Sequence, residues 1–208
     1  MTPSAPQPAA SSAQSASSAR SRLLAAAITA FGERGFHGTT TRDIATAAGM
    51  SPAALYVHHR SKEDLLYAIS FEGHESLLEL MRATVVDGQT PTERLRAVMH
   101  AFVLRHALDH TRARIINYDL EALTPEHRAE IVVLRRGMDA LVRQIVEDGV
   151  ATGEFTTTDA RLTTLALLSL GVDVSRWFRD NAGPHAWSAQ DVATHYAGLA
   201  LQLVGATD

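Results

Sequence analysis

Residues 35–66 constrain the fold of this chain more than any other stretch of its sequence. Gly35 and Gly38 interrupt a preceding helical pattern, and the hydroxyls of residues 39–41 are suited to capping a new helix. Apolar residues then recur at helical spacing from Ile44 until Gly49, and a glycine is typical of a helix end. The pattern predicts a short helix followed by a tight turn.

A second short helix begins with Ser51 and Pro52, which suit the N-cap and the first helical position. Leu55 is expected to face the core, and Ser61 caps a further helix with an acidic first turn. Two helices joined in this way, the second one narrow and able to donate hydrogen bonds, are typical of a helix-turn-helix that enters the DNA major groove. The alternative is an ordinary helical hairpin with polar residues facing water. The expected outer face of the second helix carries Ala53, Ala54, Tyr56, His58 and His59.

A helix-turn-helix would use residues 52–59 as its recognition helix and would grip phosphate at the start of the supporting helix. Two small residues would keep the recognition helix thin enough to reach thymine methyl groups. The candidates are Thr41 and Arg42 for phosphate, Tyr56, His58 and Lys62 for phosphate or base edges, and Ala53 and Ala54 for thymine.

The charge distribution favours the DNA-binding interpretation over the hairpin. Residues 20–62 carry six lysines or arginines and two acids, whereas residues 63–208 carry a net charge of −8. The whole chain has a net charge of −4, so its positive charge is concentrated around the predicted hairpin. This asymmetry indicates a localised anionic partner.

Residues 22–66 resemble the N-terminal domain of the TetR (tetracycline-repressor-like) transcriptional regulators. The matching features are a lead helix ending in FGERGF, then TTTRDIATAAG, then AALYVHHRSKEDLL, in order and without gaps. The resemblance implies DNA contacts at Ser51 as well as at the seven candidates above. It also implies a three-helix DNA-binding domain followed by a larger helical domain that binds a ligand and dimerises.

The rest of the chain is predicted to be all-α, because it lacks the alternation of apolar and polar residues that marks strands. Caps and glycines predict helices over residues 62–86, 91–108, 112–123, 125–151, 160–179 and 189–204, with Phe155 packed in a link. The predicted divisions are a disordered tail at 1–19, the DNA-binding domain at 20–66 and the helical domain at 67–208. Alternatively, the tail with Arg20 and Arg22 follows an adjacent minor groove.

Cysteine content and hydropathy restrict the class of protein. The chain has no cysteine, which excludes disulfides and cysteine-based zinc sites and fits a reducing cytoplasm. No apolar run approaches the ~20 residues that span a bilayer. We therefore expect a cytoplasmic protein.

The last two predicted helices carry more apolar residues than one buried face requires, including Leu162, Leu165, Leu170 and Trp177. We expect them to form a four-helix contact in a homodimer, the alternative being a central position in a monomer. A dimer would place two recognition helices about 34–36 Å apart, one turn of DNA, and so predicts a palindromic operator.

The histidines do not form a recognisable metal or catalytic motif. Only His106 and His110 share a helical face by spacing, no HExxH is present, and Ser169 lacks a nucleophile-elbow setting. We expect no cofactor, no metal and no enzymatic activity.

A small-molecule pocket fits the sequence better. The resemblance to TetR regulators implies that the middle helices enclose an inducer and that inducer binding moves the DNA-binding domains apart. An arginine on an apolar helix, Arg176, requires an anionic partner such as Asp173, Asp119 or a ligand acid. For each candidate the alternative is ordinary core packing. The candidates are His100, Phe102, Val103, His106, Tyr118, Leu134, Met138, Leu141, Val172, Arg176 and Trp177.

The C-terminal half is similar, more loosely, to family members associated with acyl-CoA and lipid or sterol catabolism. This similarity implies that Arg112, Arg114, Arg135, Arg136 and Arg176 could meet CoA phosphates, unless they are ordinary surface charges. The sequence thus predicts a repressor released from a palindromic operator by a small molecule, with an acyl-CoA or other lipid-derived inducer. The alternatives are a constitutive DNA-binding protein, which would have a filled core between the middle helices, and a helical enzyme.

Overall fold

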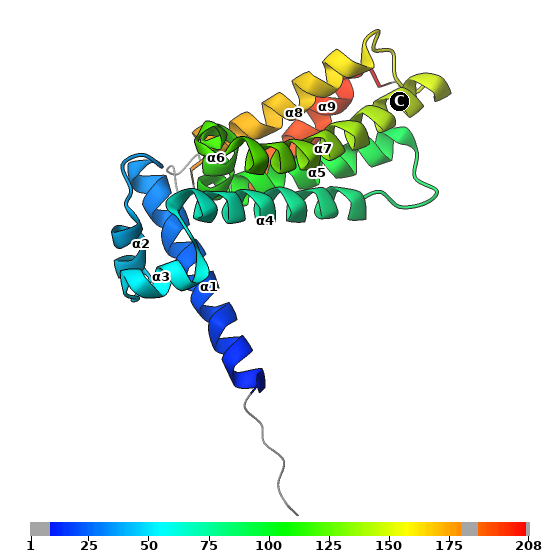
Figure 1. Cartoon of the computed structure of the whole chain (residues 1–208). Coiled ribbons are helices and arrows are strands. Elements are labelled where there is room, and N and C mark those ends of the chain that lie inside the picture. The colour runs from blue at the N-terminus through cyan, green and yellow to red at the C-terminus, as the bar shows by residue number, and fades with distance from the viewer. Residues whose placement is uncertain (1–8, 180–186, 207–208) are drawn as a thin grey trace, which may run out of the picture. The chain divides into compact units, whose positions relative to one another are not determined.

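The computed structural model describes residues 9–179 and 187–206, with side chains from residue 18 onward, and every regular element in these ranges is a helix (Figure 1). The all-α prediction is confirmed. None of the helices in these ranges combines the length and hydropathy that a membrane crossing requires. In chain order the elements are α1 (Ala9–Arg34), α2 (Thr41–Ala47), α3 (Pro52–His58), α4 (Lys62–Ala83), α5 (Pro91–Leu108), α6 (His110–Tyr118), the 3-10 helix η1 (Leu120–Ala122), α7 (Pro125–Thr152), α8 (Ala160–Trp177) and α9 (Ala189–Leu203).

The chain divides into two compact units, Met1–Ile69 and Ser70–Asp208. The division falls inside α4, three residues beyond the boundary that the sequence predicts. α4 therefore contributes its first turns to the first unit and the remainder to the second.

Side-chain caps fix where the short helices of the first unit begin. Thr40 and Asp43 form a capping box in which each side chain accepts a hydrogen bond from the other residue's backbone N–H. Ser51 Oγ accepts from the N–H of Ala54 at 3.1 Å. Between the two helices Gly49 has a φ of 67°, a left-handed conformation that glycine adopts without steric cost. The predicted helix-turn-helix is present.

The core of the first unit consists of inward residues from all four of its helices. α1 contributes Leu23 and Phe31, α2 contributes Ile44, α3 contributes Leu55 and α4 contributes Leu65, and each of these side chains is at most 2% exposed. The expectation that Leu55 faces the core is confirmed.

Lys62 connects the start of α4 to the turn between α1 and α2. Its Nζ donates to the carbonyl oxygens of Phe36 at 2.7 Å and Thr39 at 2.8 Å. The same atom lies 4.3 Å from the centroid of the Phe36 ring, a cation–π contact. Two of its three donors are thus used within the protein, and they hold the turn that precedes α2.

His59 does not lie on the outer surface, and that prediction is wrong. α3 ends at His58, and the backbone at His59 is extended, so the ring turns inward and is only 3% exposed. Its Nδ1 lies 3.0 Å from Asp64 Oδ2. Burial lowers the pKa of His59, while the contact with Asp64 opposes that shift.

The helix α1 begins earlier than predicted, because residues 9–19, expected to be disordered, form its first turns. This segment is rich in alanine and has neither glycine nor proline, so a helix can extend backwards from residue 20. The remainder of the predicted tail, residues 1–8, lies outside the described residues.

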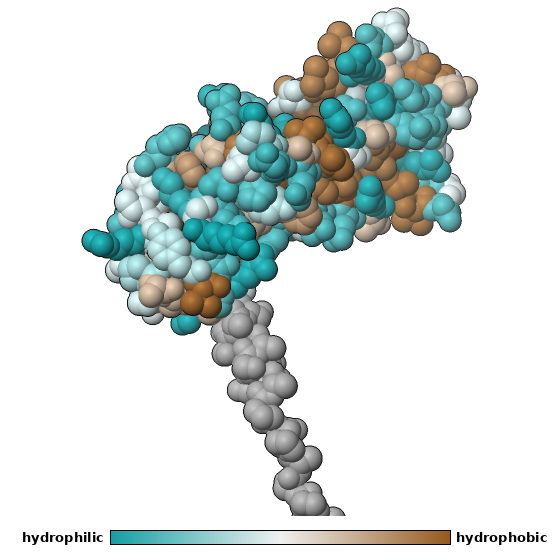
Figure 2. Space-filling view, in the orientation of Figure 1, coloured by the Kyte–Doolittle hydropathy of each residue, from teal (hydrophilic) through white to brown (hydrophobic). Residues whose placement is uncertain are grey.

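In the second unit α5 is the central helix, since it contacts α6, α7, α8 and α9. Its Leu95, Val98, Phe102 and Val103 belong to one continuous apolar core. Large apolar side chains also remain exposed on this unit, and hydrophobic patches are visible among hydrophilic ones on the face shown in Figure 2.

The predicted helix starts of the second unit are confirmed at Thr90, Thr124, Asp159 and Ser188, each of which caps its helix by accepting a backbone N–H. The single helix predicted over residues 112–123 is wrong. α6 stops at Tyr118, and a separate 3-10 turn follows. No glycine or proline marks that break in the sequence.

The link after α7 packs as expected, with Phe155 only 3% exposed. A Cβ at Gly149 would overlap the Phe155 ring, so a glycine is needed in the last turns of α7 to admit it.

Replacing Lys62 with methionine should lower the free energy of unfolding by about 1–3 kcal/mol, because two carbonyl groups lose their charge-assisted partner while the aliphatic stem is kept. Thermal unfolding followed by circular dichroism measures this. The matched control is Arg60→Met, a neighbouring exposed position. Equal melting temperatures for the two variants would contradict the structural role of Lys62.

Candidate functional site

The residues predicted to contact DNA lie mostly on accessible parts of α2 and α3. The phenol oxygen of Tyr56 is 3.2 Å from Thr41 Oγ1, a hydrogen bond that joins the starting turn of α2 to α3. Tyr56 is 54% exposed and so has room for a further contact. Of the other candidates, Arg42, Ser51 and Ala53 are exposed, and Thr41, Ala54, His58 and Lys62 are half-buried.

The positive charge of the first unit lies at its surface. Five of its arginines, at positions 20, 22, 34, 42 and 60, are exposed. Surface cations around a helix-turn-helix supply the salt-dependent part of DNA affinity, which depends on phosphate and not on sequence.

Lys62 is placed differently from the other candidates, because its ammonium group is directed at two backbone carbonyls. A DNA contact through its third donor stays a prediction. The two carbonyl contacts of Lys62 instead support a role in holding the shape of the helix-turn-helix.

Sequence reasoning missed Val57, which is 80% exposed and follows Tyr56 on α3. An apolar residue this exposed on a recognition helix is suited to contact a thymine methyl group. The sequence could have indicated this exposure, because Leu55 faces inward and a residue two positions later on a helix points well away from it.

A cavity of about 510 Å³ lies within the second unit, with walls from α4, α5, α6, α7 and α8. Most of its surface is apolar, with polar groups at a few positions, as is common for small-molecule sites. Five predicted ligand-binding residues line it: Phe102, His106, Tyr118, Met138 and Val172.

The other six predicted ligand-binding residues lie elsewhere. Val103 is fully buried in the core, and Leu134 and Leu141 pack against the core. His100 Nε2 lies 2.8 Å from the amide nitrogen of Gln190 on α9. The remaining two, Arg176 and Trp177, lie near the end of α8.

Arg176 has the internal partner that the sequence suggests. Its Nη1 is 3.4 Å from Asp173 Oδ1, and its guanidinium carbon is 5.5 Å from the centroid of the Tyr118 ring. Asp173 and Tyr118 both line the cavity, so Arg176 connects two wall residues on α8 and α6. Arg176 is well exposed, and its ion pair therefore adds little stability.

Of the five arginines considered for CoA, only Arg135 and Arg136 line the cavity. Arg135 Nη1 donates to Asn117 Oδ1 at 3.1 Å, which leaves its other donors for a ligand. Arg112 pairs with Asp109 at 3.3 Å and, like Arg114, is not part of the cavity wall.

Two buried histidines, His74 on α4 and His106 on α5, form part of the same wall, and each is 3% exposed. Burial lowers the pKa of both rings to about 4, because the charged form loses its hydration; a backbone hydrogen bond opposes the shift and the nearby Arg135 adds to it. Both imidazoles are therefore neutral at pH 7.

His74 was missed because the sequence places it on a helix that begins in the DNA-binding segment, away from the predicted middle helices. A histidine among apolar residues at helical spacing, with Leu77, Leu78 and Met81 following it, is the signal that could have found it. Within the described ranges no group of three His, Asp or Glu residues is arranged to hold a metal ion.

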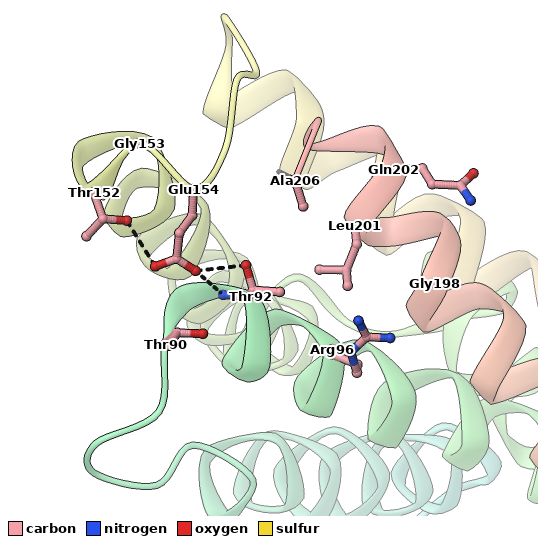
Figure 3. Close-up of a pocket in the computed structure, with 10 residues that line it drawn as sticks. All are labelled: Thr90, Thr92, Arg96, Thr152, Gly153, Glu154, Gly198, Leu201, Gln202 and Ala206. Atoms are coloured by element: carbon pink, nitrogen blue, oxygen red, sulfur yellow. Dashed lines mark hydrogen bonds between the residues drawn. The ribbon is translucent and has the colours of Figure 1, made fainter. Parts of the chain in front are cut away.

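A second hollow in this unit has polar residues on one side that serve a structural purpose (Figure 3). Glu154 lies on one side of it, and its Oε2 accepts from the N–H and the hydroxyl of Thr92 at 3.1 and 2.8 Å. Burial would raise the pKa of Glu154, but the hydrogen bonds from Thr92 and Thr152 lower it below its ordinary value. The carboxylate thus joins the loop after α7 to the start of α5.

One face of α8 remains exposed. Leu162 is 62%, Leu165 59%, Leu170 44% and Trp177 42% exposed, and they recur at the spacing of a single helical stripe. Exposed apolar stripes of this kind mark interaction surfaces in soluble proteins.

Comparison with protein families assigns both units. Residues 23–69 match the model described as bacterial regulatory proteins, tetR family, and residues 88–204 match the tetracyclin repressor-like C-terminal domain. The chain is 30% identical over 188 residues to the HTH-type transcriptional repressor KstR2 of Mycolicibacterium smegmatis, which covers 88% of this chain and 89% of that protein.

Solved structures show the same fold. A bacterial regulatory protein in the tetR family from Rhodococcus RHA1 is 40% identical, with a TM-score of 0.86 over 91% of this chain and 98% of that chain. AibR, solved in complex with isovaleryl coenzyme A and operator DNA, is 26% identical, with a TM-score of 0.78 over 91% of this chain and 100% of that chain. The chain described here therefore belongs to the TetR family and is a DNA-binding transcriptional regulator.

Proposed function

We propose that this regulator is a homodimeric repressor that a small, largely apolar ligand releases from a palindromic operator. The observation that carries the proposal is the cavity of about 510 Å³ in the second unit, whose walls combine apolar side chains with two arginines. A constitutive DNA-binding protein needs no such space, so the cavity favours ligand control over that alternative.

An acyl-CoA or another lipid-derived ligand fits this cavity. Leu77, Phe102 and Leu168 offer apolar contacts for an acyl body, and Arg135 and Arg136 can pair with an anionic group. The structure of AibR with isovaleryl coenzyme A supports this ligand class, because AibR has the same fold.

Release requires only that the ligand bind better to a form of the dimer that holds the recognition helices away from operator spacing. A tenfold loss of operator affinity corresponds to ~1.4 kcal/mol of coupling. A few additional contacts in the cavity of one form are enough to supply this difference.

The recognition surface in the proposal is α3, with Tyr56, His58 and Val57 toward the bases. Arg42 and Ser51 lie at the starts of α2 and α3, where phosphate is bound in helix-turn-helix proteins. The exposed stripe of α8, with α9, forms the proposed dimer contact.

Ligand control is tested by titrating the operator complex with isovaleryl-CoA, decanoyl-CoA and free CoA and measuring release by fluorescence anisotropy. At least one acyl-CoA should release DNA where free CoA does not, and Arg135→Ala should raise the concentration needed about tenfold, since an ion pair with the ligand is lost. Arg128→Ala, an exposed position outside the cavity, serves as control. No release by any acyl-CoA would contradict this ligand class.

Phosphate contact by Arg42 is tested with an operator first selected from random duplexes by the purified protein. Arg42→Ala should weaken binding and flatten the log–log salt dependence by ~0.9 for each lost contact, hence ~1.8 for a dimer. Arg128→Ala should leave the slope unchanged. A parallel loss of slope in both variants would indicate only a general charge effect.

The proposed dimer contact predicts that Leu162→Glu shifts the protein towards monomers in sedimentation velocity, because a charge would be buried against an apolar surface. Val133→Glu on α7 is the matched control, since Val133 is similarly exposed at 65%. If both variants sediment like the wild type, the α8 stripe is not the dimer contact.

A further inference from the structure

The cavity of the second unit contains two hydrogen-bonding groups of one kind on neighbouring helices. His74 of α4 and His106 of α5 both line it, among apolar side chains that include Leu77 and Phe102. The Phe102 ring packs on the imidazole of His106, with centroids 4.4 Å apart. These contacts restrict the orientation of the His106 ring.

Backbone hydrogen bonds determine which nitrogen of each ring carries the proton. Nδ1 of His74 is 2.8 Å from the carbonyl oxygen of Ser70, and Nδ1 of His106 is 2.8 Å from that of Phe102. A carbonyl oxygen only accepts hydrogen bonds, so each Nδ1 must donate. Each neutral ring therefore has an unprotonated Nε2, which is an acceptor and cannot donate.

Both rings keep this character over the physiological range of pH. Burial lowers their pKa values to about 4, and the cation of Arg135 adds to the effect. Both rings line the cavity, and the backbone hydrogen bonds that they make use Nδ1. Nε2 is therefore the nitrogen that each ring can offer to whatever occupies the cavity.

We infer that the cavity recognises a ligand with a hydroxyl group, alcohol or phenol, on an apolar body, and that this hydroxyl donates to His74 or His106. This inference rests on the proposed function, because it takes the cavity to be the ligand site. A purely hydrocarbon ligand would displace water from the two acceptors and leave them unpaired, which opposes binding.

The inference assigns two kinds of ligand group to different side chains by their chemistry. The arginines of α7 attract an anionic group, whereas neutral acceptors on α4 and α5 select a donor that remains uncharged. A carboxylate, which only accepts, does not suit the histidines. The proposed ligand class is therefore a hydroxylated apolar compound, with any acidic group directed at Arg135 and Arg136.

The test compares 2-naphthol with 2-methoxynaphthalene, which has the same ring system and oxygen but no donor. Isothermal titration of the full chain should give a Kd for 2-naphthol at least about tenfold lower than for the ether. His106→Leu or His74→Leu should remove most of this preference, and His106→Gln, which retains an acceptor, should keep part of it. His100→Leu, on α5 but outside the cavity, should keep all of it.

A second measurement on the wild type does not depend on how the variants fold. Nitrogen-15 NMR of histidine-labelled protein should show an unprotonated Nε2 for both rings, and 2-naphthol, but not the ether, should shift at least one of these signals. Equal affinities for the two probes, binding of neither, or Nε2 signals that 2-naphthol leaves in place would overturn the inference.

Operator release, measured separately, distinguishes this inference from the proposed function. Preference for 2-naphthol while no ligand releases DNA would support hydroxyl recognition and contradict ligand control. Release by an acyl-CoA without any preference between the two naphthalene probes would contradict only hydroxyl recognition.

Discussion

Backbone amides at helix starts need acceptors, and the way this chain supplies them determines where its helices begin. In the part of the chain that the structure describes, six helices start at a hydroxyl or carboxylate that accepts a hydrogen bond from an amide of the first turn, beginning with Thr40 and ending with Ser188. Ser61 does the same for α4 by accepting from the N–H of Asp64. Because α2 and α3 have only seven residues each, propensity alone would not keep them helical. Their caps, and the buried residues Ile44 and Leu55, stabilise the two helices that DNA recognition requires.

The two units are both helical, but they present different chemical groups. The first presents arginines and a thin helix at its surface, where solvent and salt reach them. The second has a cavity lined by two histidines that burial keeps neutral. The first unit thus uses charged groups that water screens, whereas the second adds two buried, uncharged acceptors to the arginines that line its cavity. This division fits a regulator whose DNA affinity is electrostatic and whose ligand recognition depends on shape and hydrogen bonding.

Much of the fold could be predicted from the sequence, because caps and glycines are local signals. The starts of α5, α7, α8 and α9 are marked by the capping residues Thr90, Thr124, Asp159 and Ser188. The end of α7 is marked by Gly153 in a left-handed conformation. The break after Tyr118 and the inward turn of His59 carry no such signal, since tertiary packing decides them.

The cavity was predicted in part for the same reason. His106 and Met138 could be named from a helical pattern, but their neighbour His74 depends on how distant helices meet, which periodicity does not encode. For Lys62, the position in the motif can be recognised from the sequence, but its hydrogen bonds to two carbonyl groups cannot.

Leu165, Ser169 and Asp173 belong at once to the exposed side of α8 and to the wall of the cavity. In the proposed dimer, a partner helix would therefore lie against the same residues that a ligand touches from within. Filling one cavity would alter the surface on which the second subunit rests, and the two binding events would be thermodynamically linked. Saturation curves for this protein would then deviate from a simple hyperbola, with the sign of the deviation set by whether the first occupant tightens or loosens that shared helix.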